Sequence, residues 1–414
     1  MLRDRRVAAG NDKPSHVITK SAKITEIIQI LRYINQFEID YMKALHHRSY
    51  TVIGKPRKER RCNMSNYILG FDVHKKYTQA AVMDEKGKII DRRKIIHNPE
   101  ILREYLSQFP EQTPVGFETV GNWYWVAEAI EAAGCQPMMA HAAKAKVMMG
   151  NVNKTDKLDA EGLATLLHLG KLPTVWIPDA KLRDEREIIR TRMALSKIRT
   201  GLKNRIHASL AKYALTINQK DIFAGSGYEQ LTFKLASLPT ETRSCVNREL
   251  EILDQVQRQI DLLEKRIHQA VKETPAMCLL KTLPGFGIIF SACVAHEIGT
   301  AERFPDAGHF VSYAGCVPKV SSSGGKTFYG HLRRESNHYL KWAFIEAANV
   351  IAGNSHRPSW QEKFVVRLYQ RVRQRKGHAV AVGAVARHLA EAAYWMLKRN
   401  QPYLEPQSNL PRQT

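Results

Sequence analysis

The chain has 414 residues, a formal net charge of +23 and a pI near 9.8, so two or three domains and a strongly basic surface are expected. A field of this sign concentrates phosphates and releases counterions on binding, which makes nucleic acid the leading partner class and an anionic membrane surface the second. A membrane-spanning protein is excluded because no run of about 18 uncharged apolar residues occurs, and the best candidate, residues 379–397, is interrupted by Arg387, His388 and Glu391.

Residues 1–63 are predicted to form a basic N-terminal extension. Apolar residues from Ile24 to Ile34 recur at helical spacing, and residues 55–61 are a run of mostly basic residues. The extension is either a nucleic-acid-binding arm or a dispensable preface to a fold that begins near Met64. Because the N-terminus lacks the pattern of a secretory signal, we expect the protein in the cytoplasm, associated with the nucleoid when it is bound to DNA.

Three strands are predicted next, over residues 67–73, 78–83 and 88–96. A turn signal at residues 84–87 separates the second strand from the third, so all three are expected to pair antiparallel. Alternating helices and strands follow. Their expected ranges are a helix before Pro110, a strand at 114–118, a helix at 123–133, a strand at 136–141 and a helix at 156–169. This order predicts an α/β, RNase H-like domain over residues 64–178.

Long charged helices are predicted over residues 179–275. One apolar stripe runs from Leu195 to Ile206, and a second, from Leu253 to Ala270, keeps the three-four alternation of a heptad seam. The segment is therefore expected to be a helical coiled-coil linker. Its two helices either fold back on each other as an antiparallel hairpin or pair with another subunit.

A mainly α C-terminal domain is predicted over residues 276–400, followed by a tail at 401–414. It begins with residues 283–287, a Leu-Pro-Gly-Phe-Gly segment ahead of an apolar helix that runs to Gly299. This pattern is typical of a helix-hairpin-helix element, in which glycines let backbone amides approach a phosphate at a helix start.

Four acidic residues are the candidate metal ligands: Asp72 and Glu118 at the ends of predicted strands, and Asp156 and Asp159 on a predicted helix. Residues three apart on a helix share a face, so Asp156 and Asp159 are within reach of one cation. An oxygen cage of this kind suits Mg²⁺ or Mn²⁺. Two such ions would support an in-line phosphoryl displacement. Taken alone, Asp156 is more typical of a solvated acid on a helix surface, whereas all four acids in positions that fit one fold favour a metal site.

The serine cluster at 321–323, followed by Gly324 and Gly325, is ambiguous by composition, because such segments are usually flexible loops. Its neighbours favour a catalytic hydroxyl in a setting that attracts phosphate. The neighbouring cationic candidates for nucleic-acid contact are Lys326, His331, Arg333 and Arg334.

A further set of cations lies on the predicted helix through residues 371–376. Its members are Arg371, Arg373, Arg375 and Lys376. They are a second candidate nucleic-acid surface, and the alternative is a merely solvated helix face.

Several segments together resemble the DEDD transposases of the insertion-sequence family numbered one hundred and ten, which is also similar to Piv DNA invertases. The segments are residues 70–75, 117–119, 154–160, 283–287, 314–324 and 377–387. The resemblance covers about residues 65–397. It implies a RuvC-like N-terminal domain, a coiled-coil linker and a C-terminal transposase domain with a serine nucleophile. It also implies a structured bridge RNA that pairs with donor and target DNA.

Carried over by motif, Asp72, Glu118, Asp156 and Asp159 would hold Mg²⁺ and Ser323 would be the nucleophile, with Ser322 the second candidate. Residues 335–337 read Glu-Ser-Asn where the family more often has Gly-Asn.

The resulting hypothesis is transposition by site-specific recombination of double-stranded DNA, carried out by a homodimer or homotetramer. No phosphate-binding loop of the ATPase kind occurs in the sequence, as expected if the serine ester retains the bond energy. Two alternatives stay open. One is a metal-dependent junction-resolving nuclease that uses water, and the other is a nonenzymatic nucleic-acid-binding protein.

Overall fold

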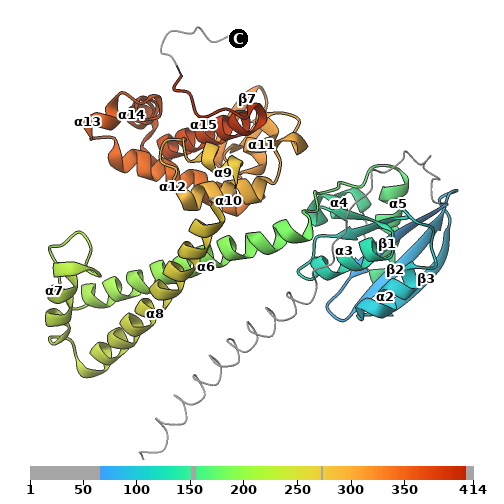
Figure 1. Cartoon of the computed structure of the whole chain (residues 1–414), viewed down its shortest axis with the longest axis horizontal. Helices are drawn as coiled ribbons and strands as arrows, with labels where there is room; N and C mark the ends of the chain where they lie inside the picture. The colour runs from blue at the N-terminus through green and yellow to red at the C-terminus, as the bar shows by residue number, and fades with distance from the viewer. Residues whose placement is uncertain (1–65, 151–154, 272–273, 407–414) are drawn as a thin grey trace, which may run out of the picture. The chain divides into compact units, whose positions relative to one another are not determined.

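The protein is described from a computed structural model, which covers residues 66–150, 155–271 and 274–406 (Figure 1). The chain divides into two compact units, the first ending at Thr174 and the second beginning at Val175. The predicted N-terminal extension, 1–63, and residues 407–414 of the predicted tail lie outside the described residues.

Five strands of the first unit form one mixed sheet in the order β3-β2-β1-β4-β5. β1 (Tyr67–Val73), β2 (Tyr77–Asp84) and β3 (Ile89–Ile96) pair antiparallel, which confirms the three predicted strands. β4 (Pro114–Glu118) and β5 (Gln136–Ala140) continue the sheet from β1 in parallel. Parallel strands require crossovers, and helices supply them here. The first unit is therefore an α/β domain, as predicted.

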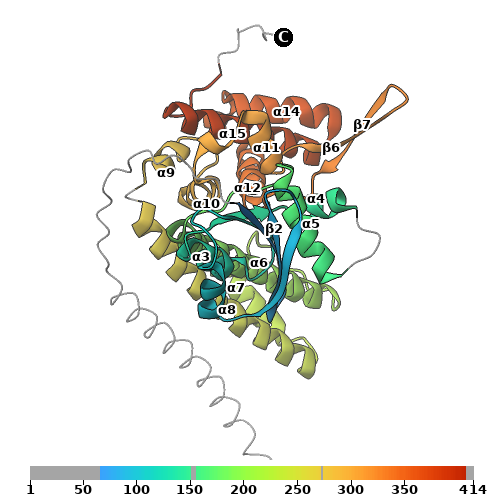
Figure 2. The ribbon, with the colours of Figure 1, turned by 90° about the vertical axis from the view of Figure 1, so that its right-hand side faces the viewer.

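Within the described part of this unit, four helices accompany the sheet: α2 (Pro99–Leu106), α3 (Trp123–Ala132), α4 (Ala142–Met149) and α5 (Asp156–His168). Of these four helices, α4 was not predicted from the sequence. Thr155 starts α5, because its hydroxyl accepts a hydrogen bond from the Leu158 amide. α5 packs against β1, β2 and β4, and Figure 2 shows α3 and α5 on opposite sides of the sheet.

Two long helices of the second unit, α6 (Ala180–Ala211) and α8 (Thr240–Val271), pack against each other. Side-chain hydrogen bonds join them at Arg192 and Glu264, Arg199 and Gln257, and Arg205 and Glu249. Residue numbers rise on α6 as they fall on α8, so the pair is antiparallel. The shorter α7 (Gly225–Leu235) packs its Leu231 beside Ile206 of α6. Of the two arrangements that the sequence left open, the intramolecular hairpin is the one present.

The rest of the second unit is a mainly helical body, as predicted. Its elements are α9 (Pro275–Leu280), α10 (Ile288–Ile298), η1 (Ala301–Arg303), α11 (Ala307–Tyr313), α12 (His338–Asn354), α13 (Pro358–Gln361), α14 (Phe364–Lys376) and α15 (His378–Arg399). α15 packs against α11, α12 and α14, and the buried core includes Phe310, Phe344 and Leu389. None of the described helices combines the length and apolarity that crossing a membrane requires.

One β-hairpin, β6 (Pro318–Ser323) and β7 (Lys326–Leu332), interrupts the helices. The loop alternative for the serine cluster is therefore wrong, because the three serines belong to β6. Figure 2 shows this hairpin as a two-stranded ribbon that projects from the helical body.

The predicted Pro-Gly segment lies between α9 and α10, which contact each other. Gly285 has φ +79°, and a Cβ at this position would lie 2.7 Å from the carbonyl oxygen of Ala347 in α12. Only glycine combines this backbone conformation with so close an approach. Packing against α12 therefore accounts for Gly285, and a phosphate contact at this turn stays a prediction.

Candidate active site

Asp72 and Glu118 lie on two neighbouring parallel strands. The register of β1 and β4 pairs Phe71 with Phe117, so the residues that follow are Asp72 and Glu118. Side chains alternate along a strand, so these two carboxylates point to the face opposite the buried Phe71 and Phe117. Neighbouring strands are about 4.8 Å apart, which leaves the two carboxylates within reach of a common point.

Gly70 lets α5 lie directly on that face. It precedes Asp72 by two residues and shares its side of β1, and a Cβ at Gly70 would lie only 2.0 Å from the carbonyl oxygen of Ala160. The first turn of α5, which carries Asp156 and Asp159, is therefore held over the end of β1. Both aspartates act electrostatically on Asp72.

His74, in the β1–β2 connection, and Tyr77, the first residue of β2, complete the cluster. The His74 Nε2 atom lies 2.9 Å from Asp72 Oδ2 and 3.2 Å from Asp156 Oδ2. Tyr77 donates its hydroxyl hydrogen to Asp156 Oδ2 at 2.6 Å, and its ring lies against that of His74 with centroids 4.6 Å apart. Asp156 is therefore tied into the cluster by Tyr77 and His74, and its role as a metal ligand stays a prediction.

The acidic cluster favours a cation on electrostatic grounds. Burial raises the pKa of Asp72 above its ordinary value, and the carboxylates of Asp159 and Asp156 raise it further, while His74 opposes them. The Asp72 side chain is 16% exposed, compared with 45% for Asp156. A partly buried carboxylate beside two others is costly unless positive charge compensates it.

The donor set fits a divalent ion. Ligand atoms from Asp72, His74 and Asp156 all lie within 4.8 Å of one another. The His74 Nε2 atom is buried and, although it lies close to two carboxylates, it makes no hydrogen bond of acceptable geometry among the described residues. Glu118 adjoins this group because β4 pairs with β1 next to Asp72. Asp159 adjoins it because it lies in the same helical turn as Asp156. Carboxylate oxygens are the ligands that Mg²⁺ and Mn²⁺ prefer in proteins.

Ser323 ends β6 beside a turn of two glycines. It pairs with Lys326 across Gly324 and Gly325, whose φ values are +56° and +74°. Positive φ at both central residues is the requirement of a type I′ turn, whose twist matches that of the two strands. Every residue from 319 to 331 is exposed, so the Ser323 hydroxyl is accessible near the tip of the ribbon.

Ser322 and Ser323 occupy opposite faces of the ribbon, because side chains alternate along β6. Ser322 Oγ lies 3.4 Å from Thr327 Oγ1 on the paired strand. A partner that approaches one face of the ribbon therefore meets only one of these two hydroxyls.

A cavity of about 1010 Å³ lies at the base of the hairpin. Its basic lining residues are Lys319, His331, Arg333, Arg334 and Arg387, and its acidic one is Glu335. Arg333 is held in place by donating from Nη1 to Ser312 Oγ at 3.1 Å. Three of the predicted nucleic-acid contacts thus share this cavity, whereas Lys326 lies at the exposed turn. Lys319 and Arg387 were not predicted.

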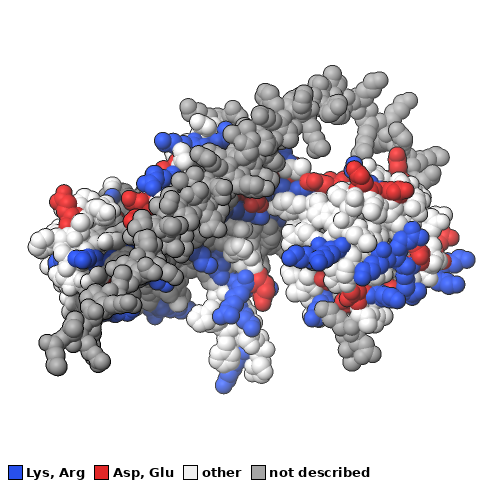
Figure 3. Space-filling model, turned by 90° about the horizontal axis from the view of Figure 1, so that it is seen from below, with Lys and Arg blue, Asp and Glu red and all other residues white. Residues whose placement is uncertain are grey.

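The second set of predicted cations lies near the C-terminal end of α14 and is exposed. Its members are Arg371, Arg373, Arg375 and Lys376. Cations in a last helical turn also stabilise the helix through its dipole, so their position does not by itself indicate a ligand. Figure 3 shows Lys and Arg side chains on the surfaces of both units.

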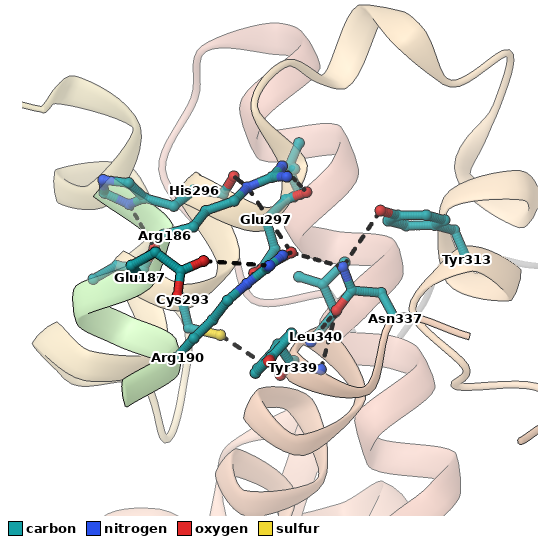
Figure 4. Close-up of polar contacts among 12 residues, drawn as sticks. Arg186, Glu187, Arg190, Cys293, His296, Glu297, Tyr313, Asn337, Tyr339 and Leu340 are labelled. Atoms are coloured by element: carbon teal, nitrogen blue, oxygen red, sulfur yellow. Dashed lines mark hydrogen bonds and ion pairs between the residues drawn. The ribbon is translucent and has the colours of Figure 1, made fainter. Parts of the chain in front are cut away.

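A buried carboxylate ties α6 to the segment that follows the hairpin (Figure 4). Glu297 is 2% exposed and accepts hydrogen bonds from Arg190 Nε at 2.8 Å and Nη2 at 3.1 Å. Asn337 donates to Glu297 Oε2 at 2.8 Å while its own Oδ1 accepts from the first amides of α12. Although burial raises the pKa of Glu297, Arg190 and Arg186 together with Asn337 bring it below the usual value. This network fixes where α12 starts relative to α6.

These features define a class of protein. A carboxylate-rich cation site on an α/β sheet, an accessible serine and a basic chain are typical of enzymes that break and join nucleic-acid phosphodiesters. The DEDD transposase family of IS110, described as "Transposase", matches residues 69–215, and the "Transposase IS116/IS110/IS902 family" matches residues 277–365. The chain therefore belongs to the IS110 family of DEDD transposases, and it is an enzyme of the DNA transposase and recombinase class. The resemblance seen in the sequence is confirmed.

Relatives with related names match over much of the chain. It is 24% identical over 339 residues to a "Probable family 20 transposase" of Pseudomonas aeruginosa, covering 81% of this chain and 98% of the relative. It is 25% identical over 359 residues to the "Transposase for insertion sequence element IS1111A" of Coxiella burnetii, covering 84% and 94%. A "Pilin gene-inverting protein" of Moraxella bovis is 29% identical over 149 residues, covering 35% and 45%.

Proposed function

We propose that this chain catalyses transposition of its insertion sequence by site-specific recombination of double-stranded DNA, with Ser323 as the nucleophile. The observation that carries the proposal is the convergence of Asp72 and Asp156 at metal-ligand spacing, in a chain that also presents an accessible serine beside cationic residues. Acidic ligands suit phosphoryl transfer, and the serine distinguishes a recombinase from a hydrolytic nuclease.

The metal would be held by Asp72, Glu118, Asp156 and Asp159. When bound, Mg²⁺ or Mn²⁺ would neutralise charge that develops on a phosphate and orient its oxygens. The strand order supports an RNase H-like, RuvC-like arrangement for residues 64–178. The helical hairpin within residues 179–275 would act as the linker to the transposase domain at 276–400.

Ser323 would attack a DNA phosphorus through Oγ. The new bond joins serine oxygen to phosphorus and the serine hydroxyl gives up its proton. The bond between phosphorus and one strand oxygen breaks, and that strand leaves as a hydroxyl after taking up a proton. Attack by a hydroxyl of the exchanged strand reverses these changes and frees the serine. One phosphate ester replaces another at each step, so no external energy source is needed.

Cations around the hairpin would contact the nucleic acids. Lys326 lies at the turn next to Ser323, and the cavity that includes Arg333 and Arg334 suits a backbone phosphate. We extend this surface to Arg371, Arg373, Arg375 and Lys376. By family resemblance the partners include a bridge RNA, and synapsis of two DNA sites calls for a homodimer or homotetramer.

The test compares variants on DNA carrying the ends of the element, in the presence of the RNA that copurifies with the protein. Ser323→Ala should abolish strand exchange and Ser322→Ala should retain most of it. Normal cleavage by both serine variants would establish the water-dependent nuclease instead. Unchanged recombination by Asp72→Ala would exclude a catalytic role for the acidic cluster, whereas DNA binding by the wild type without any cleavage would favour a nonenzymatic binding protein.

A further inference from the structure

His74 projects into the acidic cluster although it is not one of the four carboxylates. Its Nε2 atom lies 2.9 Å from Asp72 Oδ2 and 3.2 Å from Asp156 Oδ2. That nitrogen is buried, while the whole side chain remains 33% exposed. The nitrogen is thus close to one oxygen of each carboxylate at the same time.

The position of His74 is held from several sides. Its amide donates to the carbonyl oxygen of Tyr77 at 2.9 Å, and its own carbonyl accepts from Asn122 Nδ2 at 3.0 Å. The Tyr77 ring lies against the imidazole and, through its hydroxyl, holds Asp156. The same tyrosine thus braces both an imidazole and a carboxylate of the cluster. Such bracing is typical of residues around a metal, because outer contacts orient its ligands.

The distances from His74 Nε2 to the two carboxylate oxygens are those of neighbouring ligands around one ion. In octahedral coordination with bonds of about 2.1 Å, adjacent ligand atoms lie about 3.0 Å apart. The two distances from His74 Nε2 bracket this value. We propose that His74 is a direct nitrogen ligand of the ion that Asp72 and Asp156 bind. This inference rests on the proposed metal site and adds a ligand outside the acidic tetrad.

A nitrogen ligand changes which ion the site prefers. All-oxygen sites suit Mg²⁺, whereas imidazole raises the affinity for later divalent transition metals relative to Mg²⁺. The site should therefore bind Mn²⁺ more tightly than Mg²⁺, and removal of His74 should reduce that preference. The competing explanation is a protonated His74 that simply neutralises the two carboxylates, in which case a bound metal would displace the imidazole.

The direct test is pulsed electron paramagnetic resonance of Mn²⁺ bound to the full-length protein. A ¹⁴N coupling typical of metal-bound imidazole is expected in the wild type. Mn²⁺ that binds without this coupling would overturn the inference while leaving the metal site of the proposed function intact. If the protein binds no Mn²⁺ at all, both the inference and that metal site are wrong.

Variants provide the second measurement. His74→Asn should lose the ¹⁴N coupling and weaken Mn²⁺ binding about tenfold or more, with a smaller effect on Mg²⁺. His168→Asn, at the far end of the helix that begins with Asp156, is the matched control and should retain both coupling and affinity. Equal weakening of the two ions by His74→Asn, or a ¹⁴N coupling that persists in that variant, would contradict the assignment.

Discussion

Gly70 lies directly against the carbonyl of Ala160, so closely that a Cβ at Gly70 would stand 2.0 Å from that oxygen. β1 and α5 can approach this closely only because the strand has no side chain at the contact. The acidic residues lie just beyond it, Asp72 on the strand and Asp156 on the helix. One glycine thus sets the separation of the two elements that carry the cluster.

Gly70→Ala should therefore destabilise the α/β domain and weaken metal binding together. Overpacking typically lowers the free energy of unfolding by about 1–3 kcal/mol. We expect about 3 kcal/mol here, because the added Cβ would meet backbone atoms that cannot move aside. Hydrogen exchange in β1 and α5 during urea denaturation measures the loss. Gly121→Ala is the control, because a Cβ there meets nothing within 4 Å, and it should change stability by no more than about 0.5 kcal/mol. Equal stability of the two variants would contradict the packing argument.

Asp72→Asn should raise the stability of the metal-free protein at neutral pH. The pKa of Asp72 is raised above 3.8 in the folded protein, chiefly by burial. Because the folded state disfavours the charged carboxylate, the stability of the protein falls as pH rises from 3.8 through the folded pKa. Asparagine carries no charge and avoids this loss. Thermal unfolding at pH 7 without metal is the measurement, and a less stable variant would be the contrary result.

Mn²⁺ should reverse the stability order, so that the wild type becomes more stable than Asp72→Asn. An ion that binds only the folded state stabilises it by about 2.7 kcal/mol at a hundred times its Kd. The wild type should gain this amount, whereas Asp72→Asn should gain much less. Thermal unfolding with and without Mn²⁺ is the comparison, and equal stabilisation of both proteins would show that Asp72 is not a ligand.

Glu297→Gln should destabilise the helical body by about 3 kcal/mol at pH 7, because Arg186 and Arg190 would lose the charge that compensates them. In the wild type the folded pKa of Glu297 lies below 4.5, so its contribution is complete above pH 4.5 and is lost as pH falls through the folded value. The variant should lack that acid-dependent loss. Urea denaturation from pH 7 to pH 3 measures both effects.

The control for Glu297 is Glu391→Gln, which removes an exposed pair with Arg387. Exposed ion pairs contribute little, so a change of no more than about 0.5 kcal/mol is expected. Similar losses in the two variants would mean that the buried network has no special role.

The antiparallel hairpin predicts a coupling between Arg192 of α6 and Glu264 of α8. Arg192→Glu should destabilise the protein, and adding Glu264→Arg should restore part of the loss, with a coupling of about 1 kcal/mol in a double-mutant cycle. The Arg248–Glu251 pair lies within α8 alone and is the control, since reversing it leaves the packing of the two helices unchanged. Coupling that appears only in sedimenting dimers would show that the helices pair between chains.

The sequence predicted the α/β domain well because its strands carry short apolar runs separated by clear turn signals. β1 and β4 were placed with the bounds that the structure shows, and Asp72 and Glu118 followed from strand ends. The short helix α4 was missed, since its residues 142–149 are mostly small or basic and show no strong periodicity.

The site was less predictable where it depends on contacts between distant segments. His74 stood in the motif at 70–75, but its approach to Asp156 exists only once α5 packs on Gly70. Lys319 and Arg387 are far apart in the chain and meet only around the hairpin cavity. The hairpin itself was obscured because Ser-Ser-Ser-Gly-Gly has a loop-like composition, although two glycines with positive φ form a tight turn.

The central claim is that Ser323 becomes covalently linked to DNA, and the most direct measurement is to trap that adduct. The full-length protein, its copurifying RNA and DNA carrying the ends of the element are incubated with divalent metal, and the modified peptide is mapped by mass spectrometry. We predict a phosphodiester on Ser323, absent from Ser323→Ala and from Asp72→Ala. An adduct on Ser322, or cleaved DNA with no protein adduct at all, would contradict the assignment.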